Sequence, residues 1–183
     1  KKEDLCAELP AQTEFHLPLK EIVIPRLPSP MYHFVYDAGS KINFISYASG
    51  LNRYHTTYTV GRLTEIRNDI PVNRDRLQYF YDDSGRVNMV NYTDSNRIVY
   101  TKILCTYNGR QLTHFERQKK IADSFVTDKT ISFTYHADGN LLEATEHSLP
   151  YNGEDELHFV DRYEQYDKGI NADGFTLLHK DFF

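Results

Sequence analysis

The sequence predicts an all-β fold. We expect an antiparallel β-meander of successive hairpins that form an open, curled, half-barrel-like sheet, with an extended N-terminal arm. Two observations predict it. A phrase of tyrosine, turn residue, glycine and two apolar residues recurs along the 183-residue chain, and a fixed period of this kind indicates one supersecondary unit used repeatedly. The chain also holds 14 Tyr and 11 Phe but no Trp, and such rings favour half-buried sheet surfaces.

The phrase has five clear copies. Each starts at a tyrosine, passes through a glycine and ends with two apolar residues three positions apart: Tyr36…Gly39…Ile42…Ile45, Tyr58…Gly61…Leu63…Ile66, Tyr81…Gly85…Val87…Val90, Tyr107…Gly109…Leu112…Phe115 and Tyr135…Gly139…Leu141…Ala144. A weaker sixth copy begins at Tyr166. The sequence therefore predicts about ten to twelve strands, near the upper limit for one twisted sheet.

The chain consists of two consecutive regions. Residues 1–30 are rich in proline and contain no glycine, so they predict an arm or linker with one short strand at Glu21–Ile24. Residues 31–183 predict the repetitive β-meander. Residues 77–81, 98–107 and 131–135 are its clearest strands because β-branched and aromatic residues fill them. Residues 117–123 and 150–156 are polar or contain Pro or Gly, which predicts loops.

Two local devices recur in the hairpins. In Asp82–Gly85 an aspartate can open a type I turn, and the glycine can then take the left-handed conformation. After each glycine the apolar pair breaks strict alternation, because residues i and i+3 of a regular strand point to opposite faces. One extra residue between them would restore a common face. We therefore expect a β-bulge in every hairpin, bent in the same sense each time.

Bulk properties exclude several classes of function. The net charge is −5 and no basic run could neutralise several phosphates, so we expect no nucleic-acid partner. No stretch approaches the ~20 apolar residues of a transmembrane helix. The two cysteines, Cys6 and Cys105, are too few for a zinc site, and whether they pair stays open.

Some of these residues resemble a known family. Tyr-Asp-Asp-Ser-Gly-Arg-Val (81–87) and Phe-Thr-Tyr-His-Ala-Asp-Gly-Asn-Leu (133–141) resemble the YD-repeat, or Rhs-type, hairpin unit. Residues 163–171, followed by Phe175 and Leu177, resemble the uncharacterised YD-repeat-like secreted lipoproteins of gut Gram-negative anaerobes. The resemblance covers about residues 31–175. It departs from the repeat at Thr59 and His136, where Asp would stand.

What the resemblance implies is an antiparallel β-meander without an established enzymatic role. It also implies export to the periplasm or the outer-membrane surface. A lipid anchor upstream of residue 1 is implied by this analogy alone, because no lipobox is visible in these residues.

The chemistry-bearing residues favour no reaction. His33 and His55 occupy similar repeat positions, but no third ligand accompanies them, so we expect no metal and no cofactor. Asp167–Leu178 lacks the ligand spacing of a calcium loop. Glu143 and Glu146 should point to opposite faces of one strand, which does not suit a pair of glycosidase carboxylates. Nucleophile motifs are also missing from the sequence, so we expect no enzyme.

The aromatic residues fall into two sets. Tyr36, Tyr58, Tyr81, Tyr107 and Tyr135 should form a ladder in which each ring covers the turn of the next hairpin; a sugar-binding platform is the rival interpretation. The second set lies outside this repeat position, which predicts an exposed aromatic face. Its members are the candidate ligand-binding residues: Tyr47, Tyr79, Tyr92 and Tyr100.

These observations predict a non-catalytic exported binding or interaction module, with a glycan or a protein at the cell surface as ligand. The alternative is a carrier whose half-barrel pocket encloses a lipid or another apolar ligand. An enzyme is the residual hypothesis.

Overall fold

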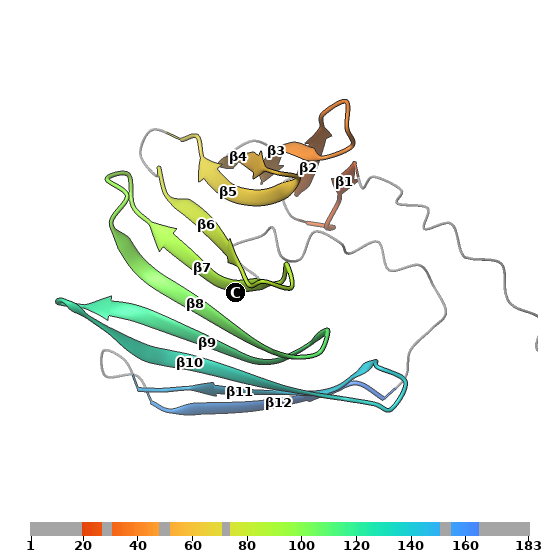
Figure 1. Ribbon diagram of the computed structural model, residues 1–183, viewed down its shortest axis with the longest axis vertical. Coiled ribbons are helices and arrows are strands. Elements are labelled where there is room, and N and C mark those ends of the chain that lie inside the picture. The colour runs from red at the N-terminus through yellow and green to blue at the C-terminus, as the bar shows by residue number, and fades with distance from the viewer. Residues whose placement is uncertain (1–19, 27–30, 48–51, 71–73, 151–154, 165–183) are drawn as a thin grey trace, which may run out of the picture.

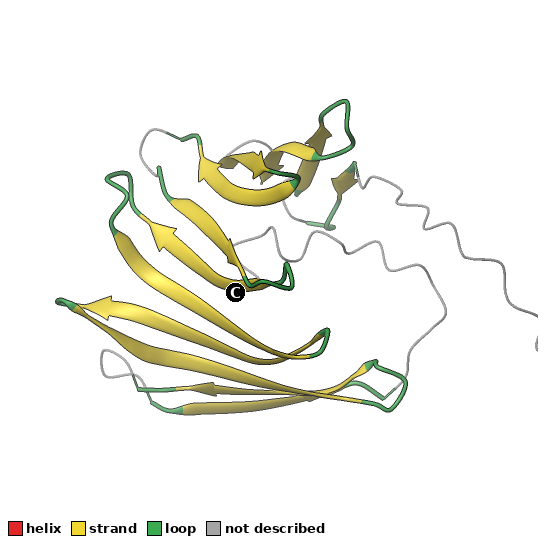
Figure 2. Ribbon diagram, in the orientation of Figure 1, coloured by secondary structure: helices red, strands yellow, loops and turns green. Residues whose placement is uncertain are grey.

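In the part of the chain that the structure describes, twelve strands form one open antiparallel sheet in which each strand pairs with the next along the chain. The computed structural model describes residues 20–26, 31–47, 52–70, 74–150 and 155–164, and none of these residues is helical (Figure 2). In the same residues no helix has the length and apolar character to cross a membrane. The predicted fold class is confirmed. The strands are β1 Glu21–Ile22, β2 Tyr32–Tyr36, β3 Ile42–Tyr47, β4 Asn52–Thr59, β5 Arg62–Asn68, β6 Arg76–Tyr81, β7 Val87–Thr93, β8 Val99–Asn108, β9 Gln111–Ile121, β10 Ser124–Tyr135, β11 Leu141–Ser148 and β12 Leu157–Arg162.

The sheet bends continuously from β1 to β12 into an open curl (Figure 1). β1 forms one edge and pairs with β2 through Glu21 opposite His33 and Ile22 opposite Tyr32. This short strand belongs to the predicted arm and pairs with the edge of the sheet. Residues 1–19 and 27–30 lie outside the described residues. β12 forms the other edge, so β1 and β12 do not meet.

A bulge bends each of the five hairpins at the same place, as predicted. In the hairpin of β6 and β7, Phe80 lies opposite Met89 but Tyr81 lies opposite Val87, so Asn88 is the extra residue. The equivalent extra residues are Asn43, Thr64, Thr113 and Leu142. Each one lies between the two apolar residues of its repeat and returns both to a common face, which explains the spacing of three.

The core lies on one face of the sheet, here called the core face. Fourteen apolar residues, from Tyr32 in β2 to Phe115 in β9, are at most 9% exposed, and the strand registers place them all on this face. Cross-strand rows such as Tyr79–Val90–Ile103 are its centre. Complete burial of one such side chain stabilises the fold by about 1.5–3 kcal/mol. The opposite face, the outer face, carries mostly polar side chains.

The five-residue turns use the predicted aspartate, with one difference. The Asp82 carboxylate accepts a hydrogen bond from the Arg86 amide at 2.9 Å, and Gly85 has a φ of 81°. In the first hairpin Asp37 accepts from the Lys41 amide in the same way. There, however, Ser40 rather than Gly39 adopts the left-handed conformation, with a φ of 61°. The glycine stands one position too early in that turn.

The loop predicted at residues 117–123 is wrong, because β9 continues to Ile121. Its polar side chains are held by an ion cluster across to β10. Asp128 is 5% exposed and accepts two hydrogen bonds from Arg117, at 2.9 and 2.8 Å. Lys119 lies 2.9 Å from the same carboxylate. A paired and hydrogen-bonded charge can occupy a buried position that an unpaired one cannot.

Candidate functional site

Three of the five repeat tyrosines, Tyr81, Tyr107 and Tyr135, are hydrogen-bonded to the hairpin that precedes each of them. The Tyr81 hydroxyl donates to the Leu63 carbonyl at 2.6 Å. Tyr107 donates to Val87 at 2.9 Å and Tyr135 donates to Leu112 at 2.6 Å. The acceptor is each time the first apolar residue of the earlier repeat. For these three tyrosines the direction is the reverse of the prediction, since each ring covers the preceding turn and not the next one.

Cations cover the faces of three of these rings. Lys41 lies 5.3 Å from the centre of the Tyr58 ring, Arg62 lies 5.4 Å from that of Tyr81, and Arg86 lies 4.8 Å from that of Tyr107. Each cation immediately precedes the first apolar residue of the earlier repeat. Such contacts contribute about 0.5–1 kcal/mol at exposed sites. In Tyr81 and Tyr107 both the hydroxyl and the ring face are engaged, which favours a scaffolding role over a sugar platform.

The predicted exposed aromatic face is not present as one surface. Tyr79 is 4% exposed and Tyr92 is 9% exposed, both within the core, and burial raises the pKa of Tyr79 well above its usual value. Tyr47 is half-buried and its ring lies 5.0 Å from that of Tyr32. Only Tyr100 of the four is exposed, at 41%. Tyr79 lies two residues from Tyr81, which puts both on the same face of β6.

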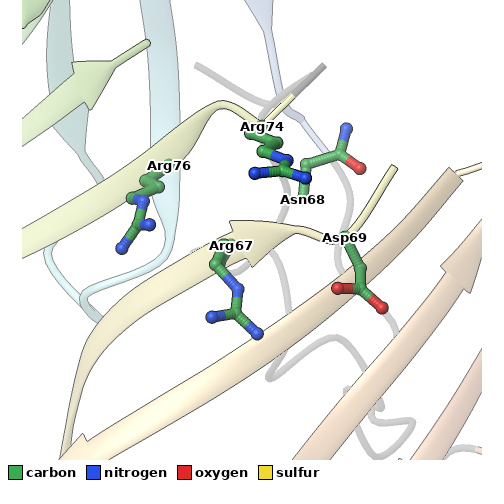
Figure 3. A pocket seen from close by; sticks show the side chains of 5 residues that line it. All are labelled: Arg67, Asn68, Asp69, Arg74 and Arg76. Carbon is green, nitrogen blue, oxygen red and sulfur yellow. The ribbon is translucent and has the colours of Figure 1, made fainter. Parts of the chain in front are cut away.

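A hollow at the ends of β5 and β6 is the candidate site, because charged and polar side chains line it. It encloses about 200 Å³, and its walls are formed by Arg67, Asn68, Asp69, Arg74 and Arg76. Figure 3 shows the three guanidinium groups around this end of the two strands. The volume is below the 300–1,000 Å³ of a typical drug-sized site, so it suits one charged group or one sugar ring of a larger ligand.

Like charges face each other at this hollow. Arg67 and Arg76 are direct cross-strand partners, an arrangement that destabilises a sheet. Arg76 is 3.2 Å from Glu65, whereas neither Arg67 nor Arg74 has an ion pair with a described residue. Asp69 is the one carboxylate of the lining, and its Oδ2 lies 3.3 Å from Nε2 of His55. The hollow therefore carries a surplus of positive charge.

Hydrogen-bond donors are also in surplus. Asn68 is 1% exposed; its carbonyl oxygen accepts from the Ile70 amide at 3.0 Å. Its buried Nδ2 has no hydrogen-bond partner, and the same is true of the buried Nε of Arg76. Buried donors are normally paired, so each unpaired one calls for an explanation. An anionic ligand with several oxygen acceptors would supply partners for the guanidinium groups of Arg67 and Arg74, which have no ion pair with a described residue.

Sequence reasoning missed this site. It searched for consecutive basic residues, whereas Arg67, Arg74 and Arg76 are separated along the chain and meet because β5 turns back into β6. The available signal was the density of arginines on both sides of Pro71.

The other candidate residues do not form a cluster in the described part of the chain. His33 and His55 lie on β2 and β4, with β3 between them. Glu143 and Glu146 point to opposite faces of β11, as predicted; Glu143 pairs with Arg162 and Glu146 with Lys129. Cys105 is a free thiol in β8, whereas Cys6 and Asp167–Leu178 lie outside the described residues. Ile45, Ile66, Val90 and Ile103, which a carrier pocket would expose to its ligand, are at most 2% exposed.

Comparison with known proteins adds little. No family model matches the chain, and no curated protein matches it. Two solved structures are similar in part. A protein of unknown function from Bacteroides fragilis is 9% identical with a TM-score of 0.38; the match covers 72% of this chain and 90% of that one. A porin-like protein from Bacteroides uniformis is 10% identical with a TM-score of 0.30, covering 70% and 86%. Likenesses this slight support no argument about function.

Proposed function

We propose that this chain is a non-catalytic binding module that recognises an acidic glycan, with one carboxylate or sulfate group of the glycan held in the arginine hollow. The observation that supports this most directly is the pair Arg67 and Arg76, which lie opposite each other across two strands with Arg74 lining the same hollow. Arginine presents donors in a planar fork that matches carboxylate and sulfate oxygens, so an anion relieves the repulsion between the two side chains.

A glycan fits this hollow better than an acidic peptide. The volume of about 200 Å³ suits one sugar ring with its charged substituent. The neighbouring groups are mixed donors and acceptors: the Asn68 amide, the Asp69 carboxylate and the His55 ring. Sugar hydroxyls can satisfy both kinds, whereas the carboxylate side chains of an acidic peptide offer acceptors only.

The test is a titration calorimetry series with three probes: an oligogalacturonate, its fully methyl-esterified form and poly-glutamate. We expect binding of the oligogalacturonate only. The double variant Arg67→Gln/Arg74→Gln should weaken it at least tenfold, because a hydrogen bond to a charged group contributes about 1.5–3 kcal/mol. The matched control Arg110→Gln/Lys120→Gln removes the same charge from exposed positions and should leave the affinity unchanged.

Two results would overturn the proposal. Equal affinity for the charged and the esterified probe would show that the anionic group is not recognised. Binding of poly-glutamate without binding of oligogalacturonate would assign the hollow to acidic peptides.

Export belongs to the same proposal and is supported by the resemblance to YD-repeat-like secreted proteins alone. Fractionation of cells that express the native gene tests it. We expect the protein in the periplasmic or outer-membrane fraction, and recovery with cytoplasmic markers would contradict this part.

A further inference from the structure

Among the described residues, β12 is an edge strand that lacks the bulge, lysine and proline by which such strands are commonly protected. All six of its residues are exposed, and apolar side chains stand on both of its faces: Phe159 at 53% and Leu157 at 49% on one, Val160 at 44% on the other. Natural edge strands are commonly protected by bulges, lysines or prolines. β12 contains no Lys or Pro, and its register with β11 is regular throughout, unlike the bulged hairpins before it.

The hydrogen bonds show which backbone groups face outward. The Tyr163 amide donates to the Leu142 carbonyl at 2.9 Å, so this pair is of the hydrogen-bonded kind. In an antiparallel ladder such pairs alternate; Asp161, Phe159 and Leu157 therefore direct their backbone groups to β11. The N–H and C=O groups of His158, Val160 and Arg162 therefore point away from β11. β12 is the lowest strand in Figure 1.

We propose that β12 pairs with β12 of a second copy of this chain, antiparallel and with Phe159 opposite its own equivalent across a twofold axis. In this register the outward groups of His158 and Val160 bond across the axis, and two phenylalanine rings meet at its centre. Aromatic cross-strand pairs of this kind are favourable.

Charge complementarity selects this register and this occupant. Moving outward from Phe159, Glu156 of one copy lies opposite Arg162 of the other, and the symmetry makes this pair twice. Both side chains project from the same face of the strand, and 56% of the Glu156 side chain and 70% of the Arg162 side chain are exposed. Glu156 contacts His147 through Oε1, which leaves its second carboxylate oxygen for the other copy. Arg162 donates to Glu143 through Nε, which leaves its other guanidinium donors for the second carboxylate.

The contact is small, because it joins two short strands along their edges. Interfaces at the low end of the size range are weak and transient. The dimer should therefore form in a concentration-dependent equilibrium. It is independent of the arginine hollow, which lies at β5 and β6.

Sedimentation velocity of the full chain over a concentration series tests the proposal, with circular dichroism to check folding. We expect the wild type to shift from monomer to dimer. Glu156→Arg alone and Arg162→Glu alone should both remain monomeric, since each places like charges opposite one another. An equimolar mixture of the two variants should dimerise again, because every opposing pair then has opposite charges.

Val160→Pro gives a second route, because proline lacks the outward amide and should abolish the dimer. Arg67→Gln/Arg74→Gln should dimerise as the wild type does, which separates this proposal from the proposed function. A wild type that is monomeric at every concentration would overturn the pairing. So would single charge variants that still dimerise, or a mixture that stays monomeric.

Discussion

At the scale of single residues, one turn has a backbone conformation that does not suit the residue found there. Val60 and Gly61 form the two-residue turn between β4 and β5 with φ values of 49° and 78°. Two positive values define the type I′ turn, which favours Asn-Gly. Val60 is β-branched and 97% exposed, so it has the steric cost of the left-handed conformation without any burial to offset it.

Val60→Asn should therefore stabilise the protein by about 1 kcal/mol, which raises Tm by about 2–4 °C for a chain of this length. Thermal unfolding followed by circular dichroism measures the change. Val126→Asn is the matched control: this valine is also exposed but lies within β10, where asparagine is disfavoured, and it should lower Tm. A Val60→Asn variant that melts at or below the wild-type temperature would show that the turn is not strained.

At the scale of the elements, neighbouring hairpins are joined by a recurrent set of contacts. Arg86 shows the arrangement most fully. It forms an ion pair with Asp82 in its own turn at 2.6 Å, stacks on Tyr107 of the next hairpin, and donates to the Gly109 carbonyl there. Tyr107 in turn donates to the Val87 carbonyl. Each hairpin is thus positioned by the one before it, beyond the backbone ladder that both share.

Tyr107→Phe should cost about 1 kcal/mol at neutral pH, the usual contribution of one hydrogen bond. It should also change the alkaline stability. Burial is the main reason why the pKa of Tyr107 rises from 10.0 to about 12. Between these values the unfolded chain has lost the proton and the folded one keeps it, so the stability from this group declines as pH rises.

Urea unfolding between pH 8 and pH 12 measures both effects. The wild type should lose stability more steeply above pH 10 than Tyr107→Phe does. Tyr163→Phe, at an exposed position, is the control and should follow the wild type. Parallel curves for Tyr107→Phe and the wild type would show that this phenol titrates normally.

At the scale of the whole molecule, burial is concentrated toward the first part of the sheet. The core face is apolar from β2 to β9 and becomes charged in β9 to β11. The row Tyr79–Val90–Ile103 continues into Arg117 and Lys129. No residue described in β11 or β12 is fully buried. Apolar burial is the main source of stability, so the end of the sheet should open more readily than its middle.

Hydrogen exchange read by mass spectrometry tests this gradient, at a concentration where the chain is monomeric. Amides of β6 to β8 should exchange slowest, near the rate set by global unfolding, and those of β12 fastest. Equal protection of β12 and β7 would contradict the gradient. Exchange in β12 that slows as the concentration rises is expected from the proposed dimer.

Much of this fold could be predicted because its signals are local. A glycine and an apolar pair three residues apart specify a turn and a bulge within a few positions of each other. Val87 and Val90 therefore predict an extra residue between them, and the strand register shows that it is Asn88. The loop prediction for residues 117–121 is wrong because their polar side chains are paired with Asp128. Asp128 lies on the neighbouring strand β10, so this pairing is not visible in the local sequence. The predicted exposure of Tyr79 and Tyr92 is wrong, because it is based on their distance in sequence from the repeat tyrosine. Their burial follows instead from the strand register, which places both side chains on the core face.

The sequence by itself determined that the chain forms bent antiparallel hairpins in series, because turn chemistry and side-chain period act over a few residues. Only the tertiary structure decided what each surface presents. Three features depend on which strands lie side by side. They are the direction in which the tyrosines contact the preceding hairpins, the meeting of three arginines beside a buried amide, and the exposure of both faces of β12. That arrangement results from the register and curvature of the whole sheet, which no short segment encodes.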